Sequence, residues 1–189
     1  MATGSAQEAR RIDARRFVFV DESGSHTSMT KPYGWAPRSE RALESVPKNR
    51  GVNTTILGAL SWSGVQAAMT LEGAADTVAF EAFVEQVLCP SLEPGQIVVM
   101  DNLSIHKSNK AREMIESCAC RLWFLPSYSP DLNPIEQAWS KLKAYLRRVG
   151  ARTKEALQEA IAQGLPSITA HDAHAWFRHC GYLPIGQLH

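Results

Sequence analysis

The sequence predicts one domain that combines a β-sheet with helices, of the α/β or α+β class. The early part of the chain contains short runs of apolar and β-branched residues, which are typical of strands. The late part shows apolar residues at helical spacing, and the two patterns alternate in between. A chain of 189 residues has the length of a single domain with a substantial core.

The composition is that of an ordinary globular protein, with 44% hydrophobic and 21% charged residues. A formal net charge of +1 gives no overall indication of nucleic-acid binding. Charge is uneven locally, because residues 137–154 contain six basic residues and no acidic one. Such a run is either an ordinary solvated helix face or a surface that contacts phosphates.

The four cysteines show no paired C-x-x-C spacing, so we expect reduced and mostly buried thiols. A zinc site of Cys118, Cys120 and a histidine is the alternative, although C-x-C spacing argues against it. No apolar stretch is long enough to span a bilayer, and the basic amino terminus lacks an apolar export core. The sequence therefore predicts a cytoplasmic protein without a membrane partner.

The amino-terminal residues 1–16 are polar and arginine-rich, which predicts a flexible lead-in. Residues 17–20 form a bulky apolar run, which predicts a strand buried on both faces and ending at Asp21. The carboxyl end of a central strand is where open α/β sheets place ligand chemistry. The alternative for Asp21 is a turn-forming residue. Glu22 is expected to point to the opposite side of the strand and to be secondary.

The middle of the chain predicts more strands and a first helix. Residues 25–50 are rich in proline and charge and predict an exposed loop with a short strand at 33–36. Residues 52–62 and 65–71 predict an antiparallel pair. Asp76 or Thr77 can cap a helix that Pro90 ends.

A second apolar run, residues 97–100, ends in Asp101 and repeats the layout seen at Asp21. Helical spacing follows in 107–118, and residues 121–125 predict another strand. Two further helices are expected, one beginning at Thr153 and one across 170–180.

The stretch that leads into the helix beginning near Pro134 carries a third acidic residue. Asn133 can cap this helix, and proline suits its first position. Glu136 then lies in the first turn, beside the apolar stripe. Because Asn133 and Glu136 have the spacing of a capping box, a purely structural role for Glu136 is the alternative.

Asp21, Asp101 and Glu136 can converge on one edge of the predicted sheet. Three carboxylates with few competing cations form an oxygen-rich site that suits Mg²⁺ or Mn²⁺. Two such ions, ~3.5–4 Å apart, would activate a nucleophile and stabilise the leaving oxygen of a phosphodiester.

Three blocks of sequence resemble the bacterial IS630-type transposases, which are relatives of the Tc1/mariner transposases. The blocks are residues 20–24, 99–107 and 126–136, and residues 35–38 resemble a further family stretch. Thirty-four residues separate Asp101 from Glu136, as in the family. The likeness covers about residues 17–183 and leaves 184–189 as a tail.

The resemblance implies a ribonuclease H-like fold, with a mixed central sheet flanked by helices. It implies that Asp21, Asp101 and Glu136 are the catalytic residues and bind two Mg²⁺ or Mn²⁺ ions. The implied function is DNA transposition, in which phosphodiester bonds at transposon ends are cleaved and strands transferred into target DNA. The site of action would be the nucleoid.

Further residues are candidates for accessory and DNA-binding roles. His106 and Asn102 lie in the second block, and the plain alternative for His106 is a locally bonded histidine at a helix entry. Candidate DNA contacts are Lys143, Arg147, Arg38 and Lys107. The first two follow Glu136 at helical spacing, which places them roughly 10–16 Å along the helix from the metals.

Family members normally carry amino-terminal helix-turn-helix domains, whereas here only the short arginine-rich lead precedes the first strand. We therefore expect a homodimer, or pairing with a chain or frameshift product that carries such a domain. The alternative function is a non-catalytic remnant that binds DNA or dimerises with a complete transposase.

Overall fold

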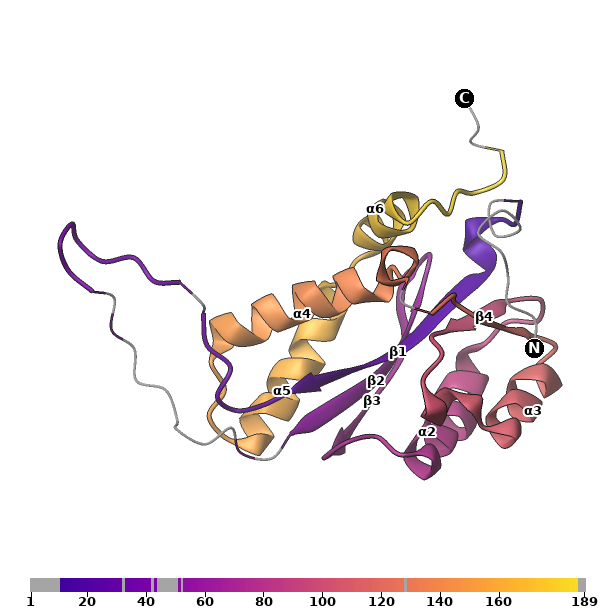
Figure 1. Cartoon of the computed structure of the whole chain (residues 1–189), viewed down its shortest axis with the longest axis horizontal. Helices are drawn as coiled ribbons and strands as arrows, with labels where there is room; N and C mark the ends of the chain where they lie inside the picture. Colours follow the sequence, from indigo (N-terminus) through magenta and orange to yellow (C-terminus); the bar gives the residue numbers. More distant parts are fainter. Residues whose placement is uncertain are drawn as a thin grey trace.

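A mixed sheet of five strands in the order β3-β2-β1-β4-β5 forms the centre of the computed structural model (Figure 1). The structure describes residues 11–31, 33–41, 43, 51, 53–127 and 129–186. The strands are β1 (Phe17–Ser25), β2 (Thr54–Ser61), β3 (Gly64–Glu72), β4 (Ile97–Met100) and β5 (Arg121–Phe124). The first three pair antiparallel, whereas β4 and β5 extend the sheet in parallel from β1.

The strand β1 continues beyond the point at which the sequence predicted its end. Its parallel pairing with β4 stops at Val20 and Met100, but its antiparallel pairing with β2 runs on to Ser25 and Thr54. The prediction that the strand ends at Asp21 was therefore wrong. The polar residues after Asp21 remain in the strand because β2 supplies partners for their backbone groups.

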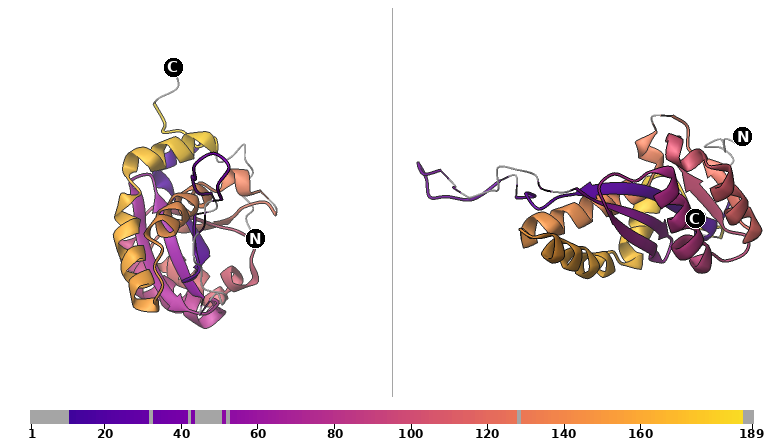
Figure 2. Two further views of the ribbon diagram at one scale, coloured as in Figure 1. Left: turned by 90° about the vertical axis from the view of Figure 1, so that its left-hand side faces the viewer. Right: turned by 90° about the horizontal axis from the view of Figure 1, so that it is seen from below.

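Helices cover both faces of the sheet (Figures 1 and 2). One face carries α4 (Ile135–Val149), α5 (Lys154–Gly164) and α6 (Ala170–His179), and the other carries α2 (Thr77–Phe83) and α3 (Asn109–Ser117). Short helical turns connect these elements: η1 (Ala14–Arg16), η2 (Val84–Leu88, a π-helix), η3 (Cys89–Ser91), η4 (Ser104–Lys107), η5 (Pro130–Leu132) and η6 (Leu165–Ser167).

Two apolar cores result from the alternation of side chains along β1. Phe17 and Phe19 pack in the core beneath α4, α5 and α6, whereas Val18 and Val20 pack in the core beneath α2 and α3. By the same alternation, Asp21 lies on the face of Phe17 and Phe19, and Glu22 lies on the face of Val18 and Val20. The two neighbouring acidic residues therefore project to opposite faces of the sheet, as expected from the strand period.

Three other local predictions were wrong. Residues 33–36 form no strand, and the side chains of Tyr33 and Trp35 are exposed, because no strand among the described residues pairs with this stretch. The predicted lead-in is folded at its end, because Ala14 is buried in the core and its N–H donates to the carbonyl of Leu183. Asn133 does not cap α4: the N-cap is Pro134, and no side-chain cap bond forms.

The predicted helix starts at Asp76 and Thr153 are confirmed, since each accepts a hydrogen bond from a backbone N–H three residues further on. The helix expected over 107–118 begins at Asn109, where Ser108 accepts the same kind of bond from the N–H of Ala111. α4 ends at Gly150, whose φ of +64° is the left-handed conformation that favours glycine. In the described part of the chain, no helix is both long and apolar enough to cross a membrane.

Candidate active site

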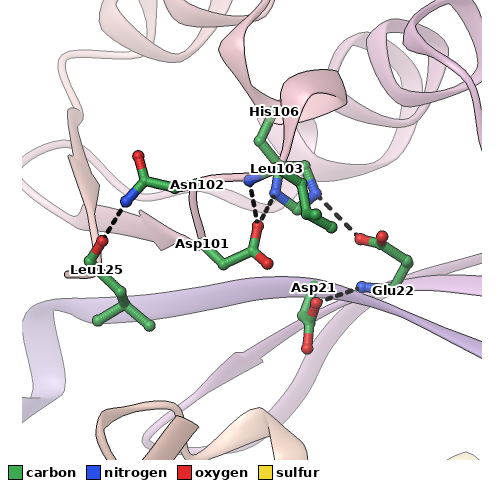
Figure 3. Close-up of polar contacts among 7 residues, drawn as sticks. All are labelled: Asp21, Glu22, Asp101, Asn102, Leu103, His106 and Leu125. Carbon is green, nitrogen blue, oxygen red and sulfur yellow. Dashed lines mark hydrogen bonds and ion pairs between the residues drawn. The ribbon is translucent and has the colours of Figure 1, made fainter. Parts of the chain in front are cut away.

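Asp21 and Asp101 lie at the same level of the sheet, on neighbouring parallel chain segments. The last parallel pair is Val20 with Met100, so Asp21 follows it within β1 and Asp101 follows it directly after β4. Figure 3 shows their side chains next to each other, with His106 beside Asp101 and Glu22 beyond it. The repeated layout of an apolar run followed by an acidic residue thus corresponds to one site.

Glu136 reaches this edge from the first turn of α4. The helix is held against the sheet by a buried stripe that includes Ile135, Ala138, Trp139, Leu142 and Leu146. Glu136 itself is exposed and, together with Asp101, lines a cavity of about 370 Å³. The other side of this cavity is lined by residues 125–127, 129–130 and 133. The structure therefore brings the three predicted acidic residues to one edge.

Asp21 is a buried carboxylate that has no basic side chain beside it within the described ranges. Asp21 is 7% exposed, and its Oδ1 accepts a hydrogen bond from the N–H of Glu22, at 2.9 Å. Burial is the main cause that raises the pKa of Asp21 to about 7, and the negative charges of Glu136, Glu22 and Asp101 contribute to this rise. The effect of Glu136 on this pKa is further evidence that the three carboxylates lie close together.

Asp101 is held by two hydrogen bonds to the same oxygen. Its Oδ1 accepts from the N–H of Leu103 at 3.0 Å and lies 2.6 Å from Nδ1 of His106. Burial alone would raise the pKa of Asp101, but the hydrogen bonds from His106 and Leu103 and the positive charges of His106 and Lys107 together outweigh burial and lower the pKa. The second oxygen, Oδ2, is left for a ligand.

His106 lies between two carboxylates and is fully buried. Its Nε2 is 3.2 Å from Oε2 of Glu22, which is an ion-pair distance without good hydrogen-bond alignment. The ring also packs on Phe80, with centroids 4.8 Å apart. Burial disfavours the charged ring, but the hydrogen bond to Asp101 and the adjacent negative charges of Glu22 and Asp101 prevail and raise the pKa of His106 to about 9. At neutral pH the residue is therefore a buried imidazolium that bridges Glu22 and Asp101.

Asn102, the second predicted accessory residue, has a structural contact. Its side-chain amide donates to the carbonyl of Leu125, which joins the chain beyond β4 to the chain beyond β5. Asn102 also lines the cavity beside Asp101. It therefore helps to hold one wall of the site.

The position of Glu136 depends on a glycine opposite Asp21. Gly58 on β2 is the direct antiparallel partner of Asp21. A β-carbon at Gly58 would lie 2.5 Å from Cη2 of Trp139, so the indole ring occupies the space that a side chain would fill. Because Trp139 is one helical turn after Glu136, this contact fixes the height of the glutamate above the sheet.

The residues present fit a divalent cation by their chemistry. Buried Asp21 faces other carboxylates, and bringing such charges together is unfavourable unless a cation lies between them. Oxygen ligands of this kind suit Mg²⁺ or Mn²⁺. In the described ranges, however, no group of three or more Asp, Glu, His or Cys side chains is spaced to enclose one metal ion. The same observation leaves the alternative zinc site at Cys118 and Cys120 without support, and the four cysteines are free thiols.

The predicted DNA contacts fall in different places. Lys143 and Arg147 line a second hollow with residues 24–30. Lys107 is exposed at the end of η4, close enough to Asp101 to lower its pKa. Arg38 is exposed in a turn of the chain between β1 and β2, and the described parts of this connection extend away from the sheet in Figure 1 and in the right-hand view of Figure 2.

Sequence reasoning missed two residues of the site. Glu22 was treated as secondary, yet it is the second carboxylate on His106. Strand alternation placed it on the α2 and α3 face, and nothing in the sequence signalled that His106 lies there. Gly58 was read only as part of a strand; a glycine inside a strand can mark a close approach of another group, which was the available signal.

Comparison with known proteins defines the class of this fold and site. The fold is ribonuclease H-like and matches the Mos1 transposase paired-end complex with left transposon end, with a TM-score of 0.72 and 18% identity over 89% of this chain and 53% of that one. It also matches the Mos1 transposase catalytic domain with raltegravir and Mg, with a TM-score of 0.67 and 15% identity over 93% of this chain and 83% of that one.

The chain belongs to the DDE superfamily endonuclease family, whose model matches residues 16–158. The Tcb2 transposase of Caenorhabditis briggsae is 26% identical over 75% of this chain and 55% of its own length. The Tcb1 transposase of the same organism is 28% identical over 63% of this chain and 46% of its own length. The resemblance to Tc1/mariner transposases is thereby confirmed, whereas the narrower IS630 assignment stays a prediction. The chain spans about half the length of these curated relatives.

Proposed function

We propose that this chain is the catalytic domain of a transposase, which cleaves phosphodiester bonds at transposon ends and transfers the strands into target DNA. The observation that carries the proposal is that Asp101 and Glu136 line one cavity while buried Asp21 lies near enough for both of their charges to raise its pKa. The Mos1 neighbours, solved with transposon ends and with Mg or Mn, support double-stranded DNA as substrate and Mg²⁺ or Mn²⁺ as cofactor.

The three carboxylates would hold two divalent ions. When bound, these ions supply a nucleophilic water or hydroxyl at neutral pH and neutralise charge on the leaving oxygen. Asp21 contributes a buried carboxylate that gains a counter-charge on binding. Asp101 contributes its Oδ2 while His106 holds Oδ1, so the carboxylate is fixed in one orientation before substrate arrives.

The assembly is also part of the proposal. The Mos1 neighbour was solved as a paired-end complex, so we propose that this chain acts on DNA as a homodimer or together with a chain that carries a helix-turn-helix domain. Its place of action would be the nucleoid, where its substrate is.

The test is strand cleavage of end-labelled duplex DNA taken from both flanks of the gene, with and without the product of the upstream reading frame. We expect cleavage with Mg²⁺ or Mn²⁺, and binding without cleavage in Ca²⁺. Asp101→Asn keeps the size of the side chain but removes its charge, so it should abolish cleavage while leaving the thermal transition in place.

The matched control is Asp76→Asn, at an exposed helix cap where asparagine serves as well as aspartate. It should cleave like the wild type. Cleavage by Asp101→Asn at the wild-type rate would refute the assignment of the site. Binding of DNA without cleavage in every metal would favour the alternative, a non-catalytic transposase remnant.

A further inference from the structure

A second hollow, of about 450 Å³, opens at the far end of β1. We call it the basic hollow. It is lined by Gly24, His26, Ser28, Met29 and Thr30 from the end of β1 and the chain beyond it, and by Lys143 and Arg147 from α4. Two cations thus face hydroxyl and imidazole groups, and none of these lining residues is acidic.

The two cations of the basic hollow are half-buried and lack a counter-charge. Neither Lys143 nor Arg147 has an acidic partner in the part of the chain that the structure describes. Lys141, on the same helix, shows the contrast, since its Nζ lies 2.6 Å from Oδ2 of Asp172. Partial removal of a charge from water is unfavourable unless an opposite charge is near. A concave site with two such cations therefore attracts an anion.

The opposite wall of the basic hollow is held in place and supplies hydrogen-bonding groups. Arg152 donates to the carbonyls of Thr27 and Met29, at 3.1 Å each, which ties this wall to the chain beyond α4. Ser28 Oγ lies 2.8 Å from Nδ1 of His26. The hydroxyls of Ser28 and Thr30 can donate to oxygens of an anion bound against Lys143 and Arg147.

The basic hollow lies at a defined distance from the carboxylates. β1 and α4 lie side by side and run in the same direction (Figure 1). Gly24 follows Asp21 by three strand residues, or about 10 Å. Lys143 follows Glu136 by seven helical residues, again about 10 Å. Two independent elements thus place the hollow at the same distance from the site.

We infer that the basic hollow binds one backbone phosphate of the DNA strand that is cleaved. A distance of about 10 Å corresponds to about three nucleotides along a duplex, at 3.4 Å per nucleotide of one strand. The inference rests on the proposed function, because that function places the strand over the carboxylates. Occupation of the hollow would align the strand so that the bond to be cut lies at Asp101 and Glu136.

The test is the salt dependence of duplex binding, measured by fluorescence anisotropy in EDTA so that no metal contributes. For the double variant Lys143→Ala/Arg147→Ala we expect weaker binding and a slope of log K against log salt that is smaller by about one unit. Because both cations act on one phosphate, each single variant should keep most of the slope. The matched control is Arg148→Ala on the same helix, an exposed residue stacked on Tyr145, which should behave like the wild type.

A second pair of variants tests the hollow itself and not the helix alone. Thr30→Glu places a carboxylate against the two cations and should abolish their contribution to the slope. Thr70→Glu makes the same change on an exposed position of β3 and should leave the slope unaltered. Thermal unfolding of every variant verifies that the chain is folded.

Three outcomes would overturn the inference. If the wild type binds DNA and the double variant shows an unchanged salt slope, the basic hollow does not bind a phosphate, and the proposed function is unaffected. A salt slope that is smaller by about two units in the double variant would mean that Lys143 and Arg147 contact two separate phosphates on an open helix face. Absence of duplex binding by the wild-type chain would refute both the hollow and the proposed role of this chain on DNA.

Discussion

The indole of Trp139 fills the space beside Gly58 that a side chain would need. A β-carbon on Gly58 would lie only 2.5 Å from Cη2 of Trp139. Gly58 is paired with Asp21 on the sheet, and Trp139 is one turn from Glu136 on α4. One contact between a glycine and a tryptophan therefore sets the position of the third carboxylate relative to the first.

Gly58→Ala should push α4 away from the sheet, because the indole is packed on all sides and has little room to move. Overpacking of this kind destabilises by about 1–3 kcal/mol, and displacement of Glu136 should slow cleavage as well. Urea unfolding and the cleavage rate measure the two effects. For the urea unfolding, Gly24→Ala is the control, since its new β-carbon would meet only the movable side chain of Asn53, at 3.3 Å.

Trp139→Phe removes the atom that meets the new methyl group, so it should partly rescue Gly58→Ala. We expect the double variant to be more stable than the sum of the two single changes predicts, by about 1 kcal/mol or more. Additive losses would mean that the two residues do not act on each other.

His106→Ala should slow cleavage more than it weakens DNA binding, because the ring orients Asp101 and is buried away from solvent. The comparison requires cleavage rates and anisotropy on the same DNA, with His179→Ala as control at the exposed end of α6. Equal losses in cleavage and binding, or no loss in either, would instead favour a locally bonded histidine without a role at the site.

Glu22→Gln keeps the shape of the side chain but removes one of the two charges on His106. The pKa of His106, which lies at about 9, should therefore fall, and a histidine titration by NMR can measure it. An unchanged pKa would mean that Glu22 does not stabilise the imidazolium.

The metal-free protein should become less stable as the pH rises from about 4 to about 7. The pKa of Asp21 is raised to about 7, so in this range the folded protein holds a proton that the unfolded chain has lost. The limiting slope for one proton is about 1.4 kcal/mol per pH unit. His106 acts in the same direction only above its ordinary pKa of 6.5, so chemical unfolding between pH 4.5 and 6.5 isolates Asp21. Asp21→Asn should flatten this part of the profile; an unaltered slope would contradict the assignment.

Above pH 7, a divalent ion should take the place of the proton on Asp21. Mn²⁺ at pH 8 should therefore raise the melting temperature of the wild type, since a ligand that binds only the folded state stabilises it. Asp21→Asn should show a smaller rise at equal ionic strength. The same rise in both proteins would place the ion elsewhere.

Much of the architecture was predictable from local pattern. The apolar runs before Asp21 and Asp101 marked buried strands with polar exits, and the spacing of apolar residues after Pro134 marked the buried side of α4. These signals work because burial imposes a period of two on strands and of 3.6 on helices, so each short stretch records which of its residues face a core. The Asp21, Asp101 and Glu136 candidates followed from such stretches and from the family resemblance.

The tertiary structure decided which side chains meet. That His106 lies between Glu22 and Asp101, that Trp139 packs against Gly58, and that Lys143 faces Ser28 all depend on pairings between distant segments. A local pattern states that a residue is buried but carries no information on the register or the element that buries it. The length of β1 shows the same limit, because residues beyond Asp21 stay in the strand only through the partners that β2 supplies.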